Sequence, residues 1–109
     1  MLEIRYYVAL GDTAPFADWF AGLDPIASAK VTRAIARMEQ GNFSNVKSVG
    51  EGVLEYKIDF GPGYRIYFGR DGDTIVILLT GGTKKLQQRD IEAAHDYWRT
   101  YKQSKRRQR

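Results

Sequence analysis

Residue types that handle phosphates and protons occupy alternate positions on two neighbouring strand-like segments. Lys57 and Asp59 lie on the first segment, and Arg65 and Tyr67 lie on the second. Because side chains of a strand alternate between its two faces, these four share one face of a hairpin. The spacing also fits a solvated sheet face with a cross-strand ion pair between Asp59 and Arg65. Two interpretations therefore stand, a charged cleft and an open polar surface.

A second cationic segment, Gly81-Gly82-Thr83-Lys84-Lys85, follows an apolar run. Glycines before lysines at a strand end can bring backbone N–H groups and ammonium charge to a phosphate. The GxxxxGK[ST] spacing of a Walker loop is absent, and a plain strand-to-helix turn also fits. The preceding run, residues 75–79, is apolar on both faces, so we expect the last helix or a partner to cover it. That cover favours a cleft over an open surface.

Other chemistries find little support in the 109 residues. There is no cysteine, and the one histidine, His95, lies on a predicted helix near Ile91 and Trp98, where packing is the better interpretation. We therefore expect no metal and no cofactor. The net charge of +4 is uneven, because residues 84–109 carry +6 and the rest carries −2. This asymmetry predicts a polyanionic partner such as nucleic acid, although a solvated helix with a basic tail also fits.

The elements that would position these groups are predicted from periodicity and turn residues. The length suits one domain, which we place at residues 1–102, followed by a frayed basic tail at 103–109. No segment predicts a membrane span or a signal peptide, so a cytoplasmic location is expected. The predicted class is α+β, with a small antiparallel sheet in the order β-α-α-β-β-β-α. The strands are 3–8, 53–60, 64–69 and 74–80, with helices starting near Pro15, Pro25 and Gln87.

The turn Gly61-Pro62-Gly63 suggests a register for the central hairpin. If it pairs Phe60 with Tyr64, Asp59 faces Arg65 and Lys57 faces Tyr67. The apolar side chains of both strands then share the opposite face. We expect the helical hairpin to cover that apolar face.

Two stretches resemble a known superfamily. The run GVLEYKIDFGPGYRIYF at 52–68 is similar to the central signature of the RelE/ParE toxins. The run GGTKKLQQRDI at 81–91 is similar to the second signature of the HigB-like, phage-derived addiction module killer proteins. The resemblance covers residues 2–101 and implies a RelE-like fold. It implies a type II toxin that cleaves mRNA on the ribosome and is neutralised by a cognate antitoxin, of helix-turn-helix type.

The resemblance also implies residue roles. Arg65 and Lys84 match the basic residues that serve the scissile phosphate, and Lys57 matches a basic residue that can carry a proton. Tyr67 completes the predicted catalytic set. Predicted RNA contacts are Lys85, Arg89, Tyr64 and Arg99.

One departure keeps other functions open. The family's C-terminal tyrosine, a proposed acid or base, has no clear equivalent, because Asp90-Ile91 occupies that region. The ParE-like inhibition of a protein target, DNA gyrase, is therefore one alternative. A non-catalytic nucleic-acid-binding module is the other.

Overall fold

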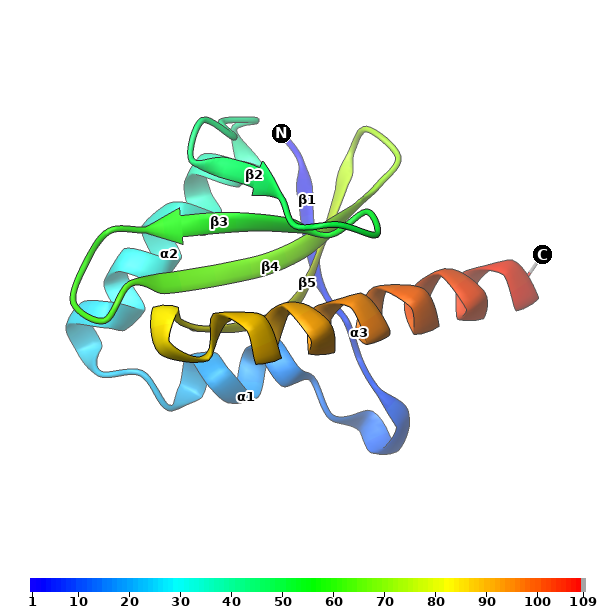
Figure 1. Ribbon diagram of the computed structural model, residues 1–109. Coiled ribbons are helices and arrows are strands. Elements are labelled where there is room, and N and C mark those ends of the chain that lie inside the picture. The colour runs from blue at the N-terminus through cyan, green and yellow to red at the C-terminus, as the bar shows by residue number, and fades with distance from the viewer. Residues whose placement is uncertain (109) are drawn as a thin grey trace.

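The computed structural model describes residues 1–108 (Figure 1). It contains a five-stranded sheet and three α-helices, with two short 3₁₀ helices. The strands are β1 (Glu3–Tyr6), β2 (Val46–Ser48), β3 (Leu54–Ile58), β4 (Tyr64–Asp71) and β5 (Ile75–Thr83). The helices are η1 (Leu10–Asp12), α1 (Pro15–Ala21), α2 (Pro25–Glu39), η2 (Lys84–Leu86) and α3 (Gln87–Arg107). The predicted α+β class is confirmed.

The strands are ordered β1-β5-β4-β3-β2 across the sheet. Strands β2 to β5 form the antiparallel meander that the turns predict, whereas β1 runs parallel to β5. The sheet is therefore mixed rather than wholly antiparallel. The chain leaves β1 through the helical hairpin and re-enters the sheet at its far edge, so the direction of β1 is fixed by tertiary packing and not by a turn.

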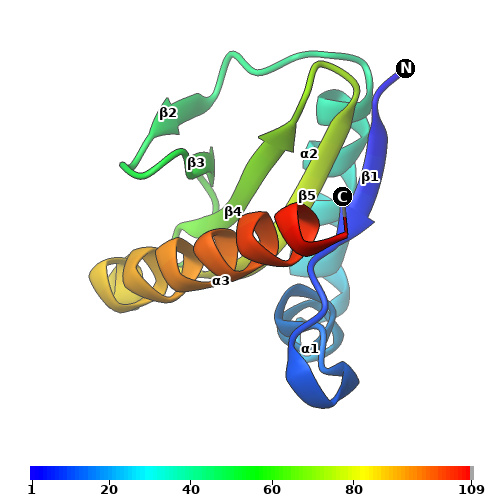
Figure 2. The ribbon, with the colours of Figure 1, turned by 90° about the vertical axis from the view of Figure 1, so that its right-hand side faces the viewer.

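Helices cover both faces of the sheet (Figure 2), and each face carries its own core. Helices α1 and α2 cover one face, where Phe16, Val31 and Met38 pack on Ile66 and Phe68. Helix α3 covers the other face. There Ala94 and Trp98 pack with Tyr67, Ile77 and Leu79. The expected cover on both faces of β5 is thus present, and α3 supplies the second layer.

Local signals explain how α2 is set. Pro25 occupies its first turn, and the Asp24 carboxylate accepts a hydrogen bond of 2.9 Å from the Ala27 N–H. The exposed cations Lys30, Arg33 and Arg37 follow one side of the helix, next to the buried stripe.

The hairpin register differs from the prediction by two residues. Lys57 pairs with Arg65 and Ile58 with Tyr64, so Asp59 does not face Arg65 and Lys57 does not face Tyr67. The turn spans residues 59–63, because Gly61 and Gly63 both adopt positive φ and the Gly63 N–H donates to the Phe60 carbonyl. A shift of two preserves which side chains share a face, so the predicted apolar and polar faces survive.

Two further elements depart from the prediction. Strand β2 pairs with β3 but has only three residues, two of them polar and exposed, which leaves no readable alternation. Helix α3 continues through Arg107, so residues 103–107 are helical instead of frayed, while Arg109 lies outside the described residues. Asp71 holds this end, since it accepts a hydrogen bond from Tyr101 and pairs with Lys105. None of the helices in residues 1–108 has the length and apolar character to cross a membrane.

Candidate functional site: a cationic cleft at the β3–β4 turn

A cleft of about 380 Å³ lies where β3 ends, the 59–63 turn passes and β5 gives way to η2. Three cationic side chains line it, from Lys57, Arg65 and Lys84, together with one carboxylate, from Asp59. The walls are completed by the turn itself, residues 60–63. The cleft therefore brings together three of the four predicted catalytic residues and has an excess of positive charge.

Arg65 is the fixed member of this set. Only 4% of the residue is exposed, and its Nη1 donates a hydrogen bond of 2.5 Å to the Gly63 carbonyl. A Cβ at Gly63 would lie 2.8 Å from the same Nη1, and Gly63 has a φ of +77°. Glycine is thus required there for the backbone conformation and for the approach of the guanidinium. The hydrogen bond to the turn therefore holds the guanidinium in place where it lines the cleft.

Arg65 belongs to a buried polar cluster, which we define as Glu55, Arg65, Tyr67 and Asp90. Glu55 is fully buried, with its Oε2 3.9 Å from Arg65 Nε. Gln87 Nε2 donates a hydrogen bond of 2.9 Å to the same Glu55 oxygen. The carboxylate supplies the negative charge that a buried guanidinium needs, so Glu55 positions Arg65.

The sequence prediction did not include Glu55, Gln87 or Asp90 as site residues. Glu55 does fall on the predicted polar face, in register with Lys57, and that alternation was the available signal. Asp90 packs so closely on β5 that a Cβ at Gly82 would overlap its carboxylate. This contact fixes the start of α3 against the sheet at the base of the cleft.

Tyr67 does not reach the cleft. It is fully buried beneath α3, opposite Glu55 in the sheet, and burial, with the Glu55 charge beside it, raises the pKa of its phenol. A buried phenol that resists ionisation is suited to packing rather than to proton exchange with a substrate. The predicted catalytic role of Tyr67 therefore loses its geometric basis.

Lys57 and Lys84 are the exposed cations of the cleft. The Lys57 side chain is 51% exposed and its Nζ lies 3.5 Å from Asp59 Oδ1. Lys84 is exposed at the start of η2, and its backbone N–H donates to the Pro62 carbonyl over 3.3 Å. That backbone bond ties the end of β5 to the β3–β4 turn, which places Lys84 across the cleft from Lys57.

The glycines before Lys84 do not form a phosphate-binding loop. Gly81 and Gly82 belong to β5, are buried, and pair with Ile66 and Arg65. A Cβ on Gly81 would overlap the ring of Trp19. The two glycines make room for side chains on opposite faces, so of the two interpretations the structural one describes them, and only Lys84 contributes to the cleft.

The residues predicted to contact RNA are scattered. Lys85 is exposed on η2, next to the cleft but outside its lining, and Arg89 is exposed and paired with Asp90 at 3.1 Å. Tyr64 is buried on the opposite face, in contact with Phe60 and Trp19. The structure therefore does not bring Tyr64 together with Arg65.

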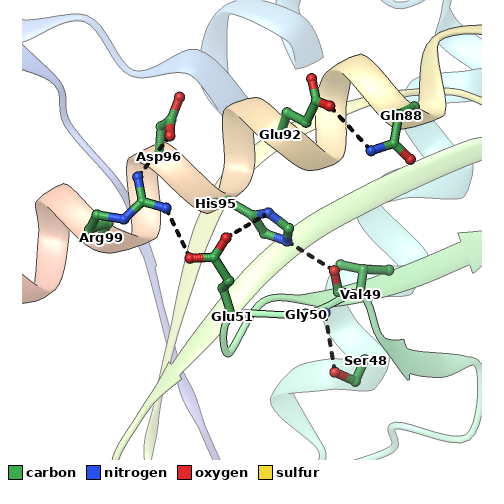
Figure 3. A network of polar contacts seen from close by, with 9 residues as sticks. All are labelled: Ser48, Val49, Gly50, Glu51, Gln88, Glu92, His95, Asp96 and Arg99. Atoms are coloured by element: carbon green, nitrogen blue, oxygen red, sulfur yellow. Dashed lines mark hydrogen bonds and ion pairs between the residues drawn. The ribbon is translucent and has the colours of Figure 1, made fainter.

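Arg99 lies in a separate polar network that joins the β2–β3 turn to α3 (Figure 3). Glu51 lies between Arg99 Nη2, at 2.9 Å, and His95 Nδ1, at 3.3 Å. His95 Nε2 donates to the Val49 carbonyl over 2.9 Å. This agrees with the prediction of a packing histidine and gives Arg99 a structural role at the other end of β3. Over residues 1–108, no three His, Asp or Glu side chains gather as a metal site requires.

Fold and cleft together define a small α+β protein with a cationic site at one end of its sheet. The sequence model of a protein family, the phage-derived Gp49-like proteins (DUF891), matches residues 18–106 of this chain. An uncharacterized protein of Haemophilus influenzae is 40% identical over 88 residues, which cover 80% of this chain and 89% of the relative. The chain belongs to the Gp49-like family, a toxin-like family related to RelE and HigB.

Proposed function

We propose that this protein is the HigB-like toxin of a type II toxin–antitoxin system and acts as an mRNA endoribonuclease. The proposal includes action on ribosome-bound mRNA without a metal ion, and neutralisation by a cognate helix-turn-helix antitoxin. The observation that carries it is the hydrogen-bonded, buried guanidinium of Arg65 between two exposed lysines, Lys57 and Lys84, in one cleft. Membership of a toxin-like family supports the same proposal.

The chemistry that these residues can perform is attack of a ribose 2′-oxygen on the adjacent phosphorus. The bond from phosphorus to the 5′-oxygen breaks, which leaves a 2′,3′-cyclic phosphate and a 5′-hydroxyl. One proton leaves the 2′-hydroxyl and one reaches the departing 5′-oxygen. Charge on the phosphoryl oxygens increases in the transition state, and preorganised cations stabilise it.

Roles in this reaction are assigned from exposure and geometry. Arg65 offers a planar, permanently charged group for two phosphate oxygens, and its buried position limits reorganisation. Lys84 supplies a second charge from the opposite wall. Lys57, the exposed amine beside Asp59, is the group for proton transfer.

The test is controlled expression of the chain alone, followed by sequencing of RNA 5′ ends and by an in vitro assay on translated mRNA with and without a chelator. Growth arrest with new 5′-hydroxyl ends, abolished in Lys57→Ala/Lys84→Ala, is the expected result. Arrest without RNA cleavage would contradict the nuclease assignment and support the gyrase-type alternative. RNA binding with neither arrest nor cleavage would support a non-catalytic binding module.

A further inference from the structure

A second cavity adjoins the cleft. It measures about 190 Å³ and lies between α2 and the edge of β3, beyond the point where β2 stops pairing. The two cavities share Lys57, Asp59 and Phe60, so these residues form a ridge between them. A single-stranded nucleic acid bound in the cleft would have only this ridge to cross before it reached α2.

The far wall of the second cavity is cationic. Lys30, Arg33 and Arg37 line it, and their spacing places them on one side of α2 over roughly 10 Å of helix. Lys30 Nζ lies 4.8 Å from the centroid of the Phe60 ring, which links this row to the ridge. We call Lys30, Arg33 and Arg37 the α2 basic row.

The α2 basic row is electrostatically available, in contrast to much of α3. Within residues 1–108, none of its three side chains makes an ion pair. On α3, carboxylates within 4 Å pair with Arg89, Arg99 and Lys105. Three unpaired cations on one helix face favour a polyanion, and the spacing suits successive phosphates of a single strand.

We propose that the α2 basic row binds the RNA backbone that flanks the scissile phosphate, so that the substrate runs from the cleft over Phe60 and along α2. This inference rests on the proposed function and adds to it a site for flanking nucleotides. Asp59, an exposed carboxylate on the ridge, repels the strand at the crossing. In this proposal the charges that hold the flanking RNA lie on α2, next to the cleft, and not on the basic end of α3.

The experiment measures binding of 2′-O-methyl RNA, which lacks the nucleophile, by fluorescence anisotropy at several salt concentrations. Oligonucleotides of about four and about twelve residues distinguish the cleft alone from the cleft with its flanking site. The test variant is Lys30→Ala/Arg33→Ala/Arg37→Ala. The matched control removes three exposed α3 cations that have no ion pair within residues 1–108, in Lys102→Ala/Arg106→Ala/Arg107→Ala.

We expect the α2 variant to lose at least tenfold in affinity for the long oligonucleotide and little for the short one. Its salt slope should fall by about 2, since each phosphate contact on a single strand contributes about 0.7. The α3 control should lose threefold or less, and Asp59→Asn should bind the long RNA more tightly. Thermal unfolding confirms that each variant is folded.

The failures are distinguishable. If the parent protein cleaves RNA and the α2 variant binds the long oligonucleotide as tightly as the parent, the α2 site is overturned and the proposed function stands. Equal losses in the α2 and α3 variants, at both lengths, overturn it in favour of a diffuse field. Loss of antitoxin capture with unchanged RNA affinity overturns it in favour of a protein surface. A parent that binds neither oligonucleotide overturns the α2 site as a binder of free RNA, whereas the growth and 5′-end assays decide the proposed function separately.

Discussion

Arg65 is buried, so we expect its removal to affect the stability of the fold as well as RNA cleavage. The polar face predicts an exposed arginine, yet α3 and the Gly63 carbonyl enclose it and Glu55 lies beneath. We expect Arg65→Ala to lower the free energy of unfolding by about 3 kcal/mol, because it leaves the Glu55 carboxylate buried with less compensation. Urea denaturation measures this.

The matched variant is Glu55→Gln/Arg65→Ala, which removes both charges and keeps an acceptor for Gln87. It should recover a large part of the lost stability while remaining inactive on RNA. An Arg65→Ala protein with the parent's urea midpoint would contradict the coupling. Activity in the double variant would show that Arg65 does not serve the phosphate.

Lys84 tests whether a lysine of the cleft contributes to RNA cleavage, and its neighbour Lys85 is the matched control. Both are exposed and adjacent, but Lys84 lines the cleft and Lys85 does not. Lys84→Ala should lower the rate of RNA cleavage by about 100-fold, the effect of removing one charge-stabilising donor. Lys85→Ala should change it by less than about threefold. Single-turnover cleavage measures both, and equal losses would indicate a general electrostatic field instead of a positioned lysine.

At the scale of elements, the sequence defines faces better than registers. Once the apolar side chains of both strands share one face, alternation places Lys57 and Arg65 together on the other, and an error of two residues leaves this unchanged. The pairing itself depends on the conformation of Gly61 and Gly63, which no alternation reports. The same limit applies to β2, whose three residues gain their strand geometry from β3.

The site was predicted in part, for a related reason. Residue type and face identify Lys57 and Arg65, the strand-end motif and the family resemblance identify Lys84, and the cleft unites the three. Burial separates Tyr67 from them, and burial depends on how α3 lies across the sheet. Side chains of α3 such as Gln87 and Asp90 enter the site through that packing, so strand patterns alone could not have found them.

The C-terminal part of α3 depends on one carboxylate. Lys105 pairs with Asp71 and Tyr101 donates a 2.5 Å hydrogen bond to it, and these contacts lower the pKa of Asp71. Stability from this group is present above the unfolded pKa, near 4, and is lost as the pH falls through the lowered folded value. We expect the protection factors of amides 103–107, which compare their exchange with that of the unstructured chain at the same pH, to fall as the pH drops through this range.

The variant Asp71→Asn should produce the same change at neutral pH. Exchange should accelerate roughly fivefold, which corresponds to about one lost hydrogen bond of 1 kcal/mol. Asp73→Asn, on the same turn and without an ion pair among residues 1–108, is the control and should leave exchange unchanged. The Tyr101 phenol reports the contact independently, since burial and Asp71 raise its pKa to about 12. An ultraviolet titration in which Tyr101 ionises normally would count against the contact.

Across the whole molecule, ion pairs as well as the sequence decide which positive charges are available to a ligand. The +6 segment, residues 84–109, contains cations that α3 uses for its own ion pairs, whereas the three cations of the α2 basic row have no ion pair within residues 1–108. The cations that line the cleft and the second cavity follow one path, from Lys84 across Lys57 to Arg37. The proposed RNA would follow this path, where α2 flanks the β3–β4 turn.

The last prediction concerns the proposed antitoxin, which would act on that same side of the protein. A partner with acidic residues can cover the cleft, and its charge would speed association at low salt. Co-expression with the neighbouring helix-turn-helix protein should restore growth, and the purified complex should not cleave mRNA. Stopped-flow association should slow as salt rises, and less so for Lys30→Ala/Arg33→Ala/Arg37→Ala if the antitoxin extends onto α2. An intact complex that cleaves at the rate of the free chain would exclude occlusion of the cleft while leaving the nuclease assignment in place.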